Sequence, residues 1–406
     1  MACSKTTSSP LRFVAVGQSL IKRDLRDDPS KGWKEIQKII QATDIAFTNF
    51  EGTLRGSHGG WPMKDGLTHA SDPVVLDTLK EIGFNAVSLS NNHAFDWGSG
   101  GILSTLEEVG KRGFLHAGIG ANKVDASRPG ILDTDKGRVA MVSMDASPQP
   151  DHFYAGERRP GINRQRVIET LALRAGDFDH LKAISDALGY EKRKAEYIRY
   201  GFRTSFEHTQ EFYGIRFEVG ARTEERHALD QEDRDRNLKA VRDAAREADF
   251  VIVYVHHHYW ESSWELPPVW LQEFARQCID AGGNAFVSHG VPMLQGIEIY
   301  QRRPIFYSLG NFIFHTGKKA AYARDSIWQS VVASCEFDDE GRLITVELTP
   351  ISLGGHGALQ DHDLSRDVPH RVDGEYGEGI LARLAGLSLP FRTRIDIEDA
   401  RGRVVI

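Results

Sequence analysis

The sequence is poor in cysteine and has no excess of basic residues. Its three cysteines, Cys3, Cys278 and Cys335, are odd in number and far apart in a chain of 406 residues. This spacing excludes a disulfide framework and a zinc site built from thiolates. Lysine and arginine together number 50 against 57 acidic residues, which gives a formal net charge of -7. A protein that coats nucleic acid needs a positive surface, so nucleic acid is not an expected partner.

Long hydrophobic runs are also missing. The first ten residues are polar, and the apolar run Leu11–Val16 is too short for a signal-peptide core or a membrane span. We therefore expect a cytoplasmic protein without a membrane partner. Hydrophobic residues still make up 40% of the chain. That share is enough for a sizeable core and excludes disorder as the main state.

Short β-branched or aromatic runs alternate with amphipathic stretches in two blocks of the chain. The runs predict buried strands and the stretches between them predict helices. The predicted strands are Leu11–Val16, Ile45–Phe50, Ala86–Leu89, Val139–Met144, Phe250–Val255, Ala285–Val287 and Pro304–Leu309. The predicted helices are Trp33–Gln41, Val74–Ile82, Ile102–Lys111 and Val269–Ala281. This alternation predicts one α/β domain over residues 1–406. Two further runs, 326–337 and 343–351, alternate like an antiparallel hairpin, so residues 326–406 are expected to complete a mixed sheet.

The segment between the two blocks, residues 157–249, has a different composition. It holds 19 basic and 19 acidic residues among 93, whereas charged residues are 26% of the whole chain. This neutral balance predicts solvated helices joined by ion pairs, and we expect helices at Asp179–Tyr200 and Asp233–Glu247. The segment is interpreted as an inserted helical cap. A disordered linker is the weaker alternative, because aromatic residues recur along it.

The sixteen histidines are the strongest lead to function, because imidazole binds metal ions and transfers protons near neutral pH. Polar, potentially reactive residues follow five of the predicted strands directly. Loops at such strand ends meet at one edge of an α/β sheet, so we expect a shared active site there. The five groups are Gly17-Gln18, Asn49-Phe50-Glu51-Gly52, Asn91-Asn92-His93-Ala94-Phe95-Asp96, His256-His257-His258 and Ser288-His289-Gly290.

These motifs, in this order and with Gln295-Gly296 and Tyr307-Ser308-Leu309-Gly310-Asn311-Phe312 after them, resemble the CapA family. The namesakes of that family act in poly-γ-glutamate capsule biosynthesis. The resemblance covers roughly Leu11 to Phe314, apart from the poorly matched cap. It implies a calcineurin-like metallophosphoesterase fold, an αββα sandwich of two mixed sheets flanked by helices.

Two positions depart from the family pattern. Gln18 stands where the family usually has aspartate, and Pro292 stands where it usually has histidine. Both positions would belong to a two-metal site, and hard divalent ions need carboxylate charge, so a full binuclear site is not expected. A single divalent ion could be held by Glu51, Asn92, one of His256 or His258, and His289. The alternative is that these groups bond one another around a water-filled cavity, and we favour no cofactor.

The candidate acids and bases are Glu51, His93, His256, His258 and His289. Neutral donors that could bind substrate and a developing oxyanion are Gln18, Asn49 and Asn92. This set suits removal of a proton next to a carbonyl and its return from the opposite face. CapA-like proteins include peptide epimerases, among them the lasso-peptide enzymes that convert a C-terminal L-residue to the D-form. The leading hypothesis is therefore a metal-independent, two-base peptide epimerase of a ribosomal precursor.

Two alternatives stay open: a hydrolase of phosphoesters or peptides that uses one metal ion, and a non-catalytic scaffold in peptide or polymer maturation. The expected partner under the leading hypothesis is a precursor peptide. Trp260 and Trp264 could line a pocket for an aromatic side chain of that peptide, or pack within their loop. The cap is expected to select the substrate.

Overall fold

The chain forms two compact units in the computed structural model, which describes residues 10–27, 31–66, 68–202, 210–316, 322, 324–353 and 368–406. One unit comprises Met1–Gln165 and Glu232–Ile406, and the other comprises Arg166–Gln231. The first unit is called the body and the second the insert. The body contains every candidate catalytic residue.

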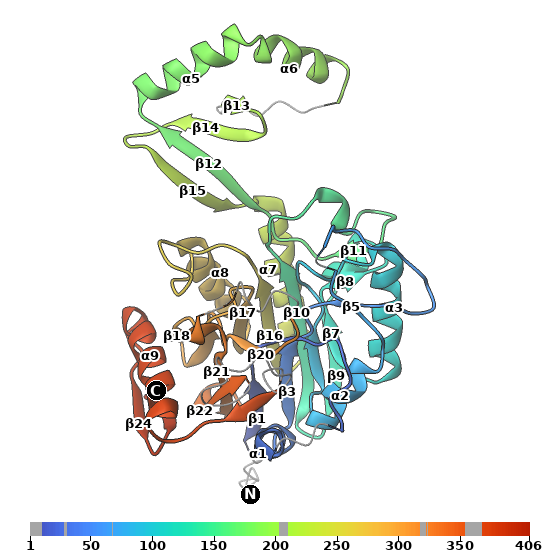
Figure 1. Ribbon diagram of the computed structural model, residues 1–406, viewed down its shortest axis with the longest axis vertical. Coiled ribbons are helices and arrows are strands. Elements are labelled where there is room, and N and C mark those ends of the chain that lie inside the picture. Colours follow the sequence, from blue (N-terminus) through green and yellow to red (C-terminus); the bar gives the residue numbers. More distant parts are fainter. Residues whose placement is uncertain are drawn as a thin grey trace, which may run out of the picture. The chain divides into compact units, whose positions relative to one another are not determined.

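The first sheet of the body has nine strands in the order β24-β25-β22-β21-β1-β3-β6-β7, with β23 paired to β22 (Figure 1). Its parallel part runs from β1 to β7, and β21 pairs antiparallel to β1, so the sheet is mixed as predicted. The strands are β1 (Leu11–Ala15), β3 (Ile45–Asn49), β6 (Ala86–Ser88), β7 (Leu115–Ala117), β21 (Gln329–Phe337), β22 (Leu343–Leu353), β23 (Pro369–Arg371), β24 (Ile395–Glu398) and β25 (Arg401–Val404).

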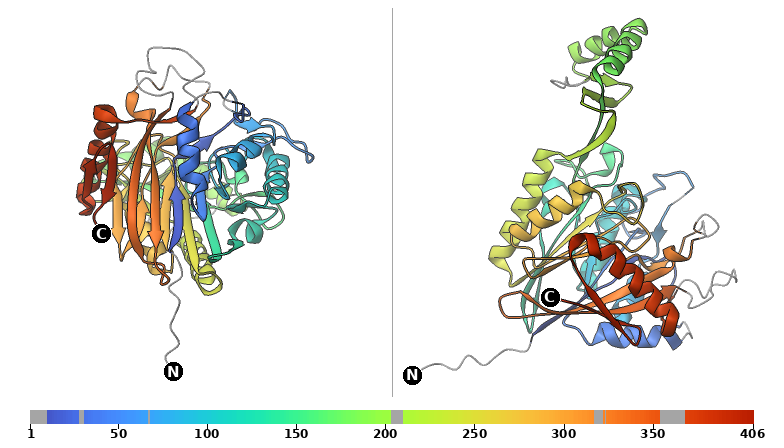
Figure 2. Two further views of the ribbon diagram at one scale, coloured as in Figure 1. Left: turned by 90° about the horizontal axis from the view of Figure 1, so that it is seen from below. Right: turned by 90° about the vertical axis from the view of Figure 1, so that its left-hand side faces the viewer.

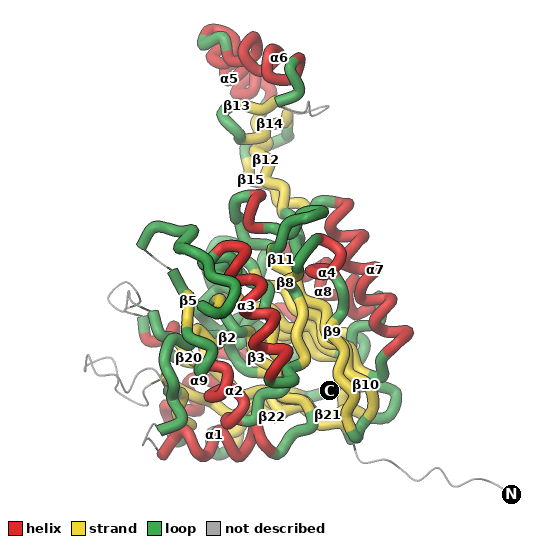
Figure 3. Tube along the Cα trace, turned by 90° about the vertical axis from the view of Figure 1, so that its right-hand side faces the viewer, coloured by secondary structure: helices red, strands yellow, loops and turns green. Residues whose placement is uncertain are grey.

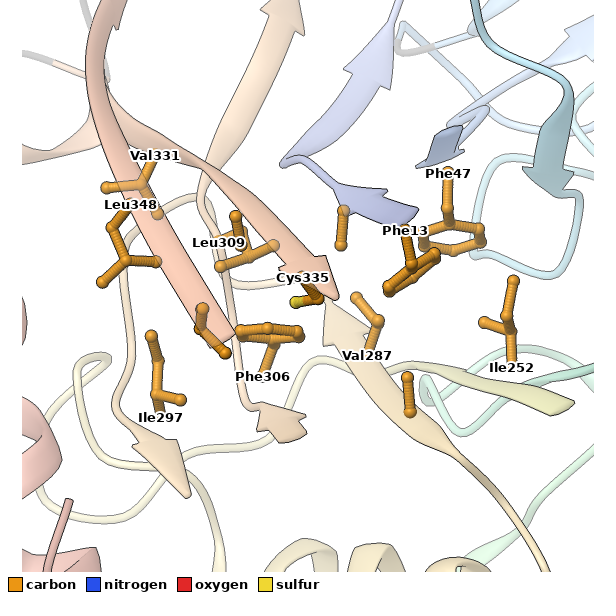
Figure 4. Packing of buried hydrophobic residues seen from close by; sticks show 14 of the residues in the cluster. Phe13, Phe47, Ile252, Val287, Ile297, Phe306, Leu309, Val331, Cys335 and Leu348 are labelled. Carbon is orange, nitrogen blue, oxygen red and sulfur yellow. The ribbon is translucent and has the colours of Figure 1, made fainter. Parts of the chain in front are cut away.

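The second sheet has six strands in the order β18-β19-β17-β16-β10-β9. Strands β10, β16, β17 and β19 are parallel, and the two edge strands are antiparallel to their neighbours. The strands are β9 (Gly130–Thr134), β10 (Gly137–Asp145), β16 (Phe250–His256), β17 (Ala285–His289), β18 (Ile297–Tyr300) and β19 (Arg303–Phe306). Buried side chains of both sheets, such as Phe13, Phe47, Ile252 and Val287, meet in one core between them (Figure 4).

Helices cover the outer faces of the two sheets. A second apolar core joins α1 (Lys31–Gln41), α2 (Val75–Ile82) and α3 (Gly98–Lys111) to the first sheet. Helices α7 (Gln231–Glu247) and α8 (Val269–Asp280) lie on the far side of the second sheet (Figures 2 and 3). Helix α9 (Gly374–Ser388) contributes Ile380, Leu381 and Leu384 to the core at the edge of the sandwich. The body is therefore the αββα sandwich of two mixed sheets that the resemblance implied.

Three short strand pairs shape the loops at the strand ends. They are β2 (Gln18–Leu20) with β20 (Asn311–Phe314), β4 (Thr53–Leu54) with β5 (Ala70–Ser71), and β8 (Ile119–Gly120) with β11 (Gly161–Ile162). Short helical turns are α4 (Lys123–Ser127) and the 3-10 segments Asp151–Phe153, Asp325–Ile327 and Leu389–Phe391. Among the described residues, no helix is long and apolar enough to cross a bilayer.

The insert is narrower than residues 157–249 and is not purely helical. Its four-stranded sheet has the order β13-β14-β12-β15. Two helices follow β12 and precede β13 along the chain. The elements are β12 (Val167–Leu173), α5 (Ala175–Ala187), α6 (Tyr190–Arg199), β13 (Gln210–Phe212), β14 (Ile215–Val219) and β15 (Glu224–Leu229). The single helix expected at Asp179–Tyr200 is two, because the chain turns at Gly189 in the left-handed region, at φ 65°.

The helix expected at Asp233–Glu247 exists, as α7, but it belongs to the body and not to the insert. Its Asn237 and Val241 are fully buried. Asn237 donates from Nδ2 to the side-chain oxygen of Gln165 at 3.0 Å, and Asn163 donates to the Asn237 oxygen at 3.1 Å. Composition alone placed this helix in the cap, since its outward face is as charged as the insert.

Candidate active site

Loops from both sheets enclose a cavity of about 320 Å³ at one edge of the sandwich. The loops follow β1, β3 and β6 of the first sheet and β16 and β17 of the second, together with the segment around β20. The residues that line the cavity are Gln18, Leu20, Glu51, Lys64, His69, Asn92, His93, His258, Trp260, Trp264, Gly290, Val291, Pro292, Phe314, Thr316 and Tyr322. The convergence of strand ends expected from the motifs therefore occurs in the body.

Glycines let the loops approach one another closely at the rear of this cavity. A Cβ on Gly17 would lie 2.5 Å from the carbonyl oxygen of Gly310, so only glycine fits where the first loop meets Gly310-Asn311. Next to this contact, Gln18 donates from Nε2 to the side-chain oxygen of Asn311 at 3.1 Å. Gly290 has φ 123°, and a Cβ there would collide with the carbonyl oxygen of His257. These contacts hold Gln18 and the loop after His289 in fixed positions.

One wall of the cavity carries a histidine oriented by a buried aspartate. His93 Nδ1 lies 2.7 Å from Asp96 Oδ2, and Asp96 is fully buried. The backbone N–H of His69 donates to the same Asp96 oxygen at 2.8 Å, and the His69 ring meets the His93 ring edge-on at 4.1 Å. A turn at residues 91–98 makes this geometry, because it brings residues three apart together. A proton on Nδ1 directed at Asp96 leaves Nε2 of His93 as the basic nitrogen.

A second cluster joins a carboxyl of the first sheet to two histidines of the second. The ligand atoms of Glu51, His256 and His258 all lie within 4.8 Å of one another. His256 Nε2 is 3.4 Å from His258 Nε2 and 4.0 Å from Glu51 Oε1. On its other side, His256 Nδ1 is 3.2 Å from the Tyr254 hydroxyl. The backbone N–H of Glu51 donates to the carbonyl of Ser19, which fixes Glu51 just after the C-terminal end of β3.

Burial shifts the pKa values of these groups in opposite directions. Burial, with the negative charge of Asp96 adding to it, raises the pKa of Glu51 to about 8. Burial lowers the pKa of His258 to about 4 and also lowers the pKa of His93, where Asp96 opposes the shift. Burial would raise the pKa of Asp96, but His93 and Lys64 outweigh it and lower that pKa. Near neutral pH the cavity thus offers a protonated carboxyl and neutral imidazoles.

The same cluster fits one divalent metal ion. Three buried or half-buried N/O ligands close together, with room for a water or substrate atom, match the ligand count of a catalytic zinc site. Glu51 Oε2, Gln18 Oε1 and Asn92 Oδ1 are buried and have no hydrogen-bond partner among the described residues. Glu51, His256 and His258 would hold such an ion, which would supply a Lewis acid at this wall. Glu51 and the two histidines of β16 and its following loop were among the expected ligands, and Asn92 and His289 as further ligands stay predictions.

The structure brings most of the predicted site residues together. Those that line the cavity are Gln18, Glu51, Asn92, His93, His258, Trp260 and Trp264. The rings of Trp260 and Trp264 are 5.3 Å apart, and both residues line the cavity. His256 lies behind His258, fully buried.

Asn49 and His289 are fully buried and are not among the lining residues. Asn49 accepts a hydrogen bond from Asn91 at 3.3 Å, which ties the second loop to the third. Both ring nitrogens of His289 have no hydrogen-bond partner in the described part of the chain, and its ring packs 5.7 Å from that of Tyr254. Their expected roles in binding and catalysis stay predictions.

Sequence reasoning missed several residues of this site. Lys64, Phe314 and Tyr322 line the cavity, yet none belongs to a motif that the sequence singled out. Asp96 was visible two residues after the Asn-Asn-His-Ala motif, and its spacing of three from His93 was the signal for a pair. Asp145 ends β10 beside His256, and Ser147 and Tyr154 donate hydrogen bonds to it. Burial raises the pKa of Asp145 to about 7.

The fold and the cavity define an α/β sandwich protein whose strand ends enclose buried imidazoles and a carboxyl. Over residues 12–316 the chain matches the family of bacterial capsule synthesis proteins called PGA_cap. That match covers more than half of the chain, so the protein belongs to the PGA_cap family.

Individual relatives are matched over different shares of their own length. An uncharacterized protein of Sinorhizobium fredii, y4sH, is 31% identical over 97% of this chain and 92% of its own length. The capsule biosynthesis protein CapA of Bacillus anthracis is 23% identical over 76% of this chain, and the chain spans 60% of that relative. A solved phosphatase from Mycoplasma pneumoniae superposes with a TM-score of 0.42 at 12% identity, covering 86% of this chain and 95% of its own.

Proposed function

We propose that the protein is a peptide epimerase, an isomerase that converts the C-terminal L-residue of a ribosomal precursor peptide to the D-form. The observation that carries the proposal is that two acid–base groups from different loops, His93 and Glu51, line one small cavity. An epimerase without a cofactor needs two such groups, one for each face of the planar carbanion. The cavity volume of about 320 Å³ suits one residue of a peptide and not a folded partner.

His93 is the better base of the two at neutral pH. Its Nδ1 bonds Asp96 at 2.7 Å, and burial keeps the pKa of the ring below its ordinary value. Glu51 is the better acid, because burial raises its pKa to about 8. His93 Nε2 would take the Cα proton of the L-residue, and Glu51 would return a proton to the opposite face. Pairs of groups whose pKa values are driven apart in this way are typical of acid–base sites.

Deuterium exchange tests this function directly. The protein is treated with a chelator and incubated in D₂O with N-acetylated dipeptides that end in a free carboxylate. We expect deuterium at the Cα of the last residue and a rising share of the D-form by chiral chromatography. The matched control is His227→Gln, a histidine of the insert that is 3.1 Å from Glu225. No deuterium at any Cα, with the protein folded, contradicts the proposal.

A hydrolase that uses one divalent ion is the second candidate, and the cluster of Glu51, His256 and His258 favours it. It predicts stoichiometric binding of Zn²⁺ or Mn²⁺ by calorimetry, and loss of that binding in His258→Gln. It also predicts release of p-nitrophenol from p-nitrophenyl phosphate that stops with chelator. The epimerase predicts that Cα exchange survives the same chelator, so one treatment separates the two candidates.

A further inference from the structure

Lys64 gives the wall of the cavity its positive charge. It lies in the loop between β4 and β5, and its side chain is 23% exposed. Among the lining residues that the structure describes, Lys64 is the only lysine or arginine. It thus stands in one cavity with His93 and Glu51, although no motif of the sequence pointed to it.

The ammonium of Lys64 is held in place by the loop that carries His93. Lys64 Nζ lies 3.2 Å from Asp96 Oδ1 and donates to the backbone carbonyl of Asn92. It also lies 5.6 Å from the centre of the Phe153 ring. An ammonium has three donors, and these two polar contacts leave one for a ligand. Asp96 is fully buried and is not among the residues that line the cavity, whereas Lys64 is.

We propose that Lys64 binds the α-carboxylate of the residue that reacts, and so is the residue by which this site distinguishes a free peptide C-terminus from an amide. The proposal rests on the proposed function. Removing a proton from Cα beside a carboxylate places further negative charge on its oxygens, and a fixed ammonium in a partly desolvated cavity stabilises that charge. An amide at the same position would offer no charge to bind.

The aromatic lining of the cavity suits the side chain of that residue. Trp260, Trp264, Phe314 and Tyr322 all line the cavity, with the two indoles 5.3 Å apart and the rings of Phe314 and Tyr322 5.2 Å apart. Aromatic walls bind large apolar or aromatic groups. The preferred ligand is therefore a peptide that ends in a large apolar residue with a free carboxylate. N-acetyl-Ala-Trp and its C-terminal amide make a matched pair of probes that differ only in this charge.

The test measures Kd for the two probes by calorimetry, without any need for turnover. We expect the wild-type protein to bind the acid at least tenfold more tightly than the amide. Lys64→Gln should reduce this preference to less than twofold and leave the affinity for the amide unchanged, whereas Lys64→Arg keeps most of the preference. The control is Lys80→Gln, a lysine that likewise lies over an aromatic ring, that of Phe114, but does not line the cavity.

Several results would overturn the proposal. These are equal affinity for acid and amide in the wild-type protein, an unchanged preference in Lys64→Gln, or no binding of either probe. If inorganic phosphate competes as strongly as the acid does, Lys64 binds anions in general and not a peptide carboxylate in particular. If Lys64→Gln does not fold, the acid-to-amide ratios of wild type and Lys64→Arg still decide, since both should favour the acid.

The exchange experiment separates this proposal from the proposed function. A carboxylate preference that depends on Lys64, without deuterium at Cα, supports the binding site and contradicts the epimerase. Deuterium incorporated equally fast into the acid and the amide supports the epimerase and contradicts the role of Lys64. In Lys64→Gln we expect the exchange rate of the acid to fall at least tenfold more than that of the amide, because only the acid loses a charged partner, whereas both lose the contact of Lys64 with Asp96.

Discussion

The body and the insert differ in where they place some of their carboxyl and amide groups. In the body, Glu51, Gln18 and Asn92 each bury an oxygen without a hydrogen-bond partner among the described residues. In the insert, charges pair at the surface: Arg226 bonds Glu218 and Glu224, and all three side chains are about a quarter to a half exposed. A buried polar atom without a partner destabilises a fold, so such atoms persist mainly where a ligand completes them. The difference indicates that chemistry belongs to the body.

Apolar residues show the same contrast. The body buries whole rings, among them Phe13 and Phe306, between its sheets. The insert leaves large apolar side chains exposed, including Tyr200 at 64%, Phe202 at 76% and Tyr213 at 65%. A small sheet with two helices cannot bury as large a share of its surface. We therefore expect the body to carry the stability and the insert to be dispensable for folding.

The largest effect is expected from the two acid–base residues of the body. His93→Gln and Glu51→Gln should each slow Cα exchange by about 10²- to 10⁴-fold, the usual contribution of a positioned acid or base. His227→Gln in the insert should leave the rate unchanged. Both rates are measured by mass spectrometry at pH 7, and thermal unfolding checks that each variant is folded. If His227→Gln lowers the exchange rate as much as His93→Gln does, the conclusion that the reaction depends on the body and not on the insert is wrong.

The pH profile sharpens the assignment of Glu51. If this carboxyl gives up the proton, the exchange rate should fall as pH rises through about 8, since ionised Glu51 cannot donate. The rate is followed from pH 6 to 10 with the wild-type protein. A rate that keeps rising above pH 9 would instead make Glu51 a base.

Removing the insert is expected to have the next largest effect. The chain ends of the insert lie side by side, because Val167 pairs with Leu229 and the N–H of Asp230 donates to the carbonyl of Arg166. Residues 167–229 can therefore be replaced by a Gly-Gly turn. If the insert selects the substrate, KM for a full precursor peptide should rise at least tenfold, while exchange of a dipeptide stays within threefold. If the body cannot fold without the insert, the insert is structural, and the hypothesis that it selects the substrate loses its main support.

The sequence predicted the body far better than the insert, for a physical reason. Buried parallel strands such as Phe250–His256 are nearly continuous apolar runs that stand out from their surroundings. The insert strands mix charged and apolar residues, as Glu224–Leu229 does, and its sheet was not predicted. Within the site, the strand-end motifs found Glu51 and His93, but Lys64 depends on a long loop whose course only tertiary contacts fix.

Asp145 offers a smaller effect that concerns stability and not the reaction. Burial raises the pKa of this carboxyl from 3.8 to about 7. A raised carboxyl pKa means that the folded state holds a proton that the unfolded state has lost. The stability it gives is thus complete below pH 4 and falls as pH rises through 7. Between pH 5 and 8 we expect this carboxyl to lower the free energy of unfolding by an amount on the order of 2 kcal/mol. The effect is measured by urea unfolding as the change, over this pH range, in the difference between wild type and Asp145→Asn, because other buried groups titrate in both proteins. A difference that does not change with pH would contradict this.

The smallest effect is expected when one substitution, arginine to glutamine, is made once in each unit. Arg276 in the body bonds Glu298 at 2.8 and 3.2 Å, and that carboxyl is only 6% exposed and also accepts from Tyr307 at 2.6 Å. Arg276→Gln leaves a buried carboxylate without its cation, so Tm should fall by about 2 to 4 °C. Arg226→Gln breaks pairs that water already screens, and Tm should change by less than about 1 °C. Equal changes in Tm would mean that the insert relies on its surface pairs as the body relies on its buried one, and the distinction between the two units would then not hold for stability.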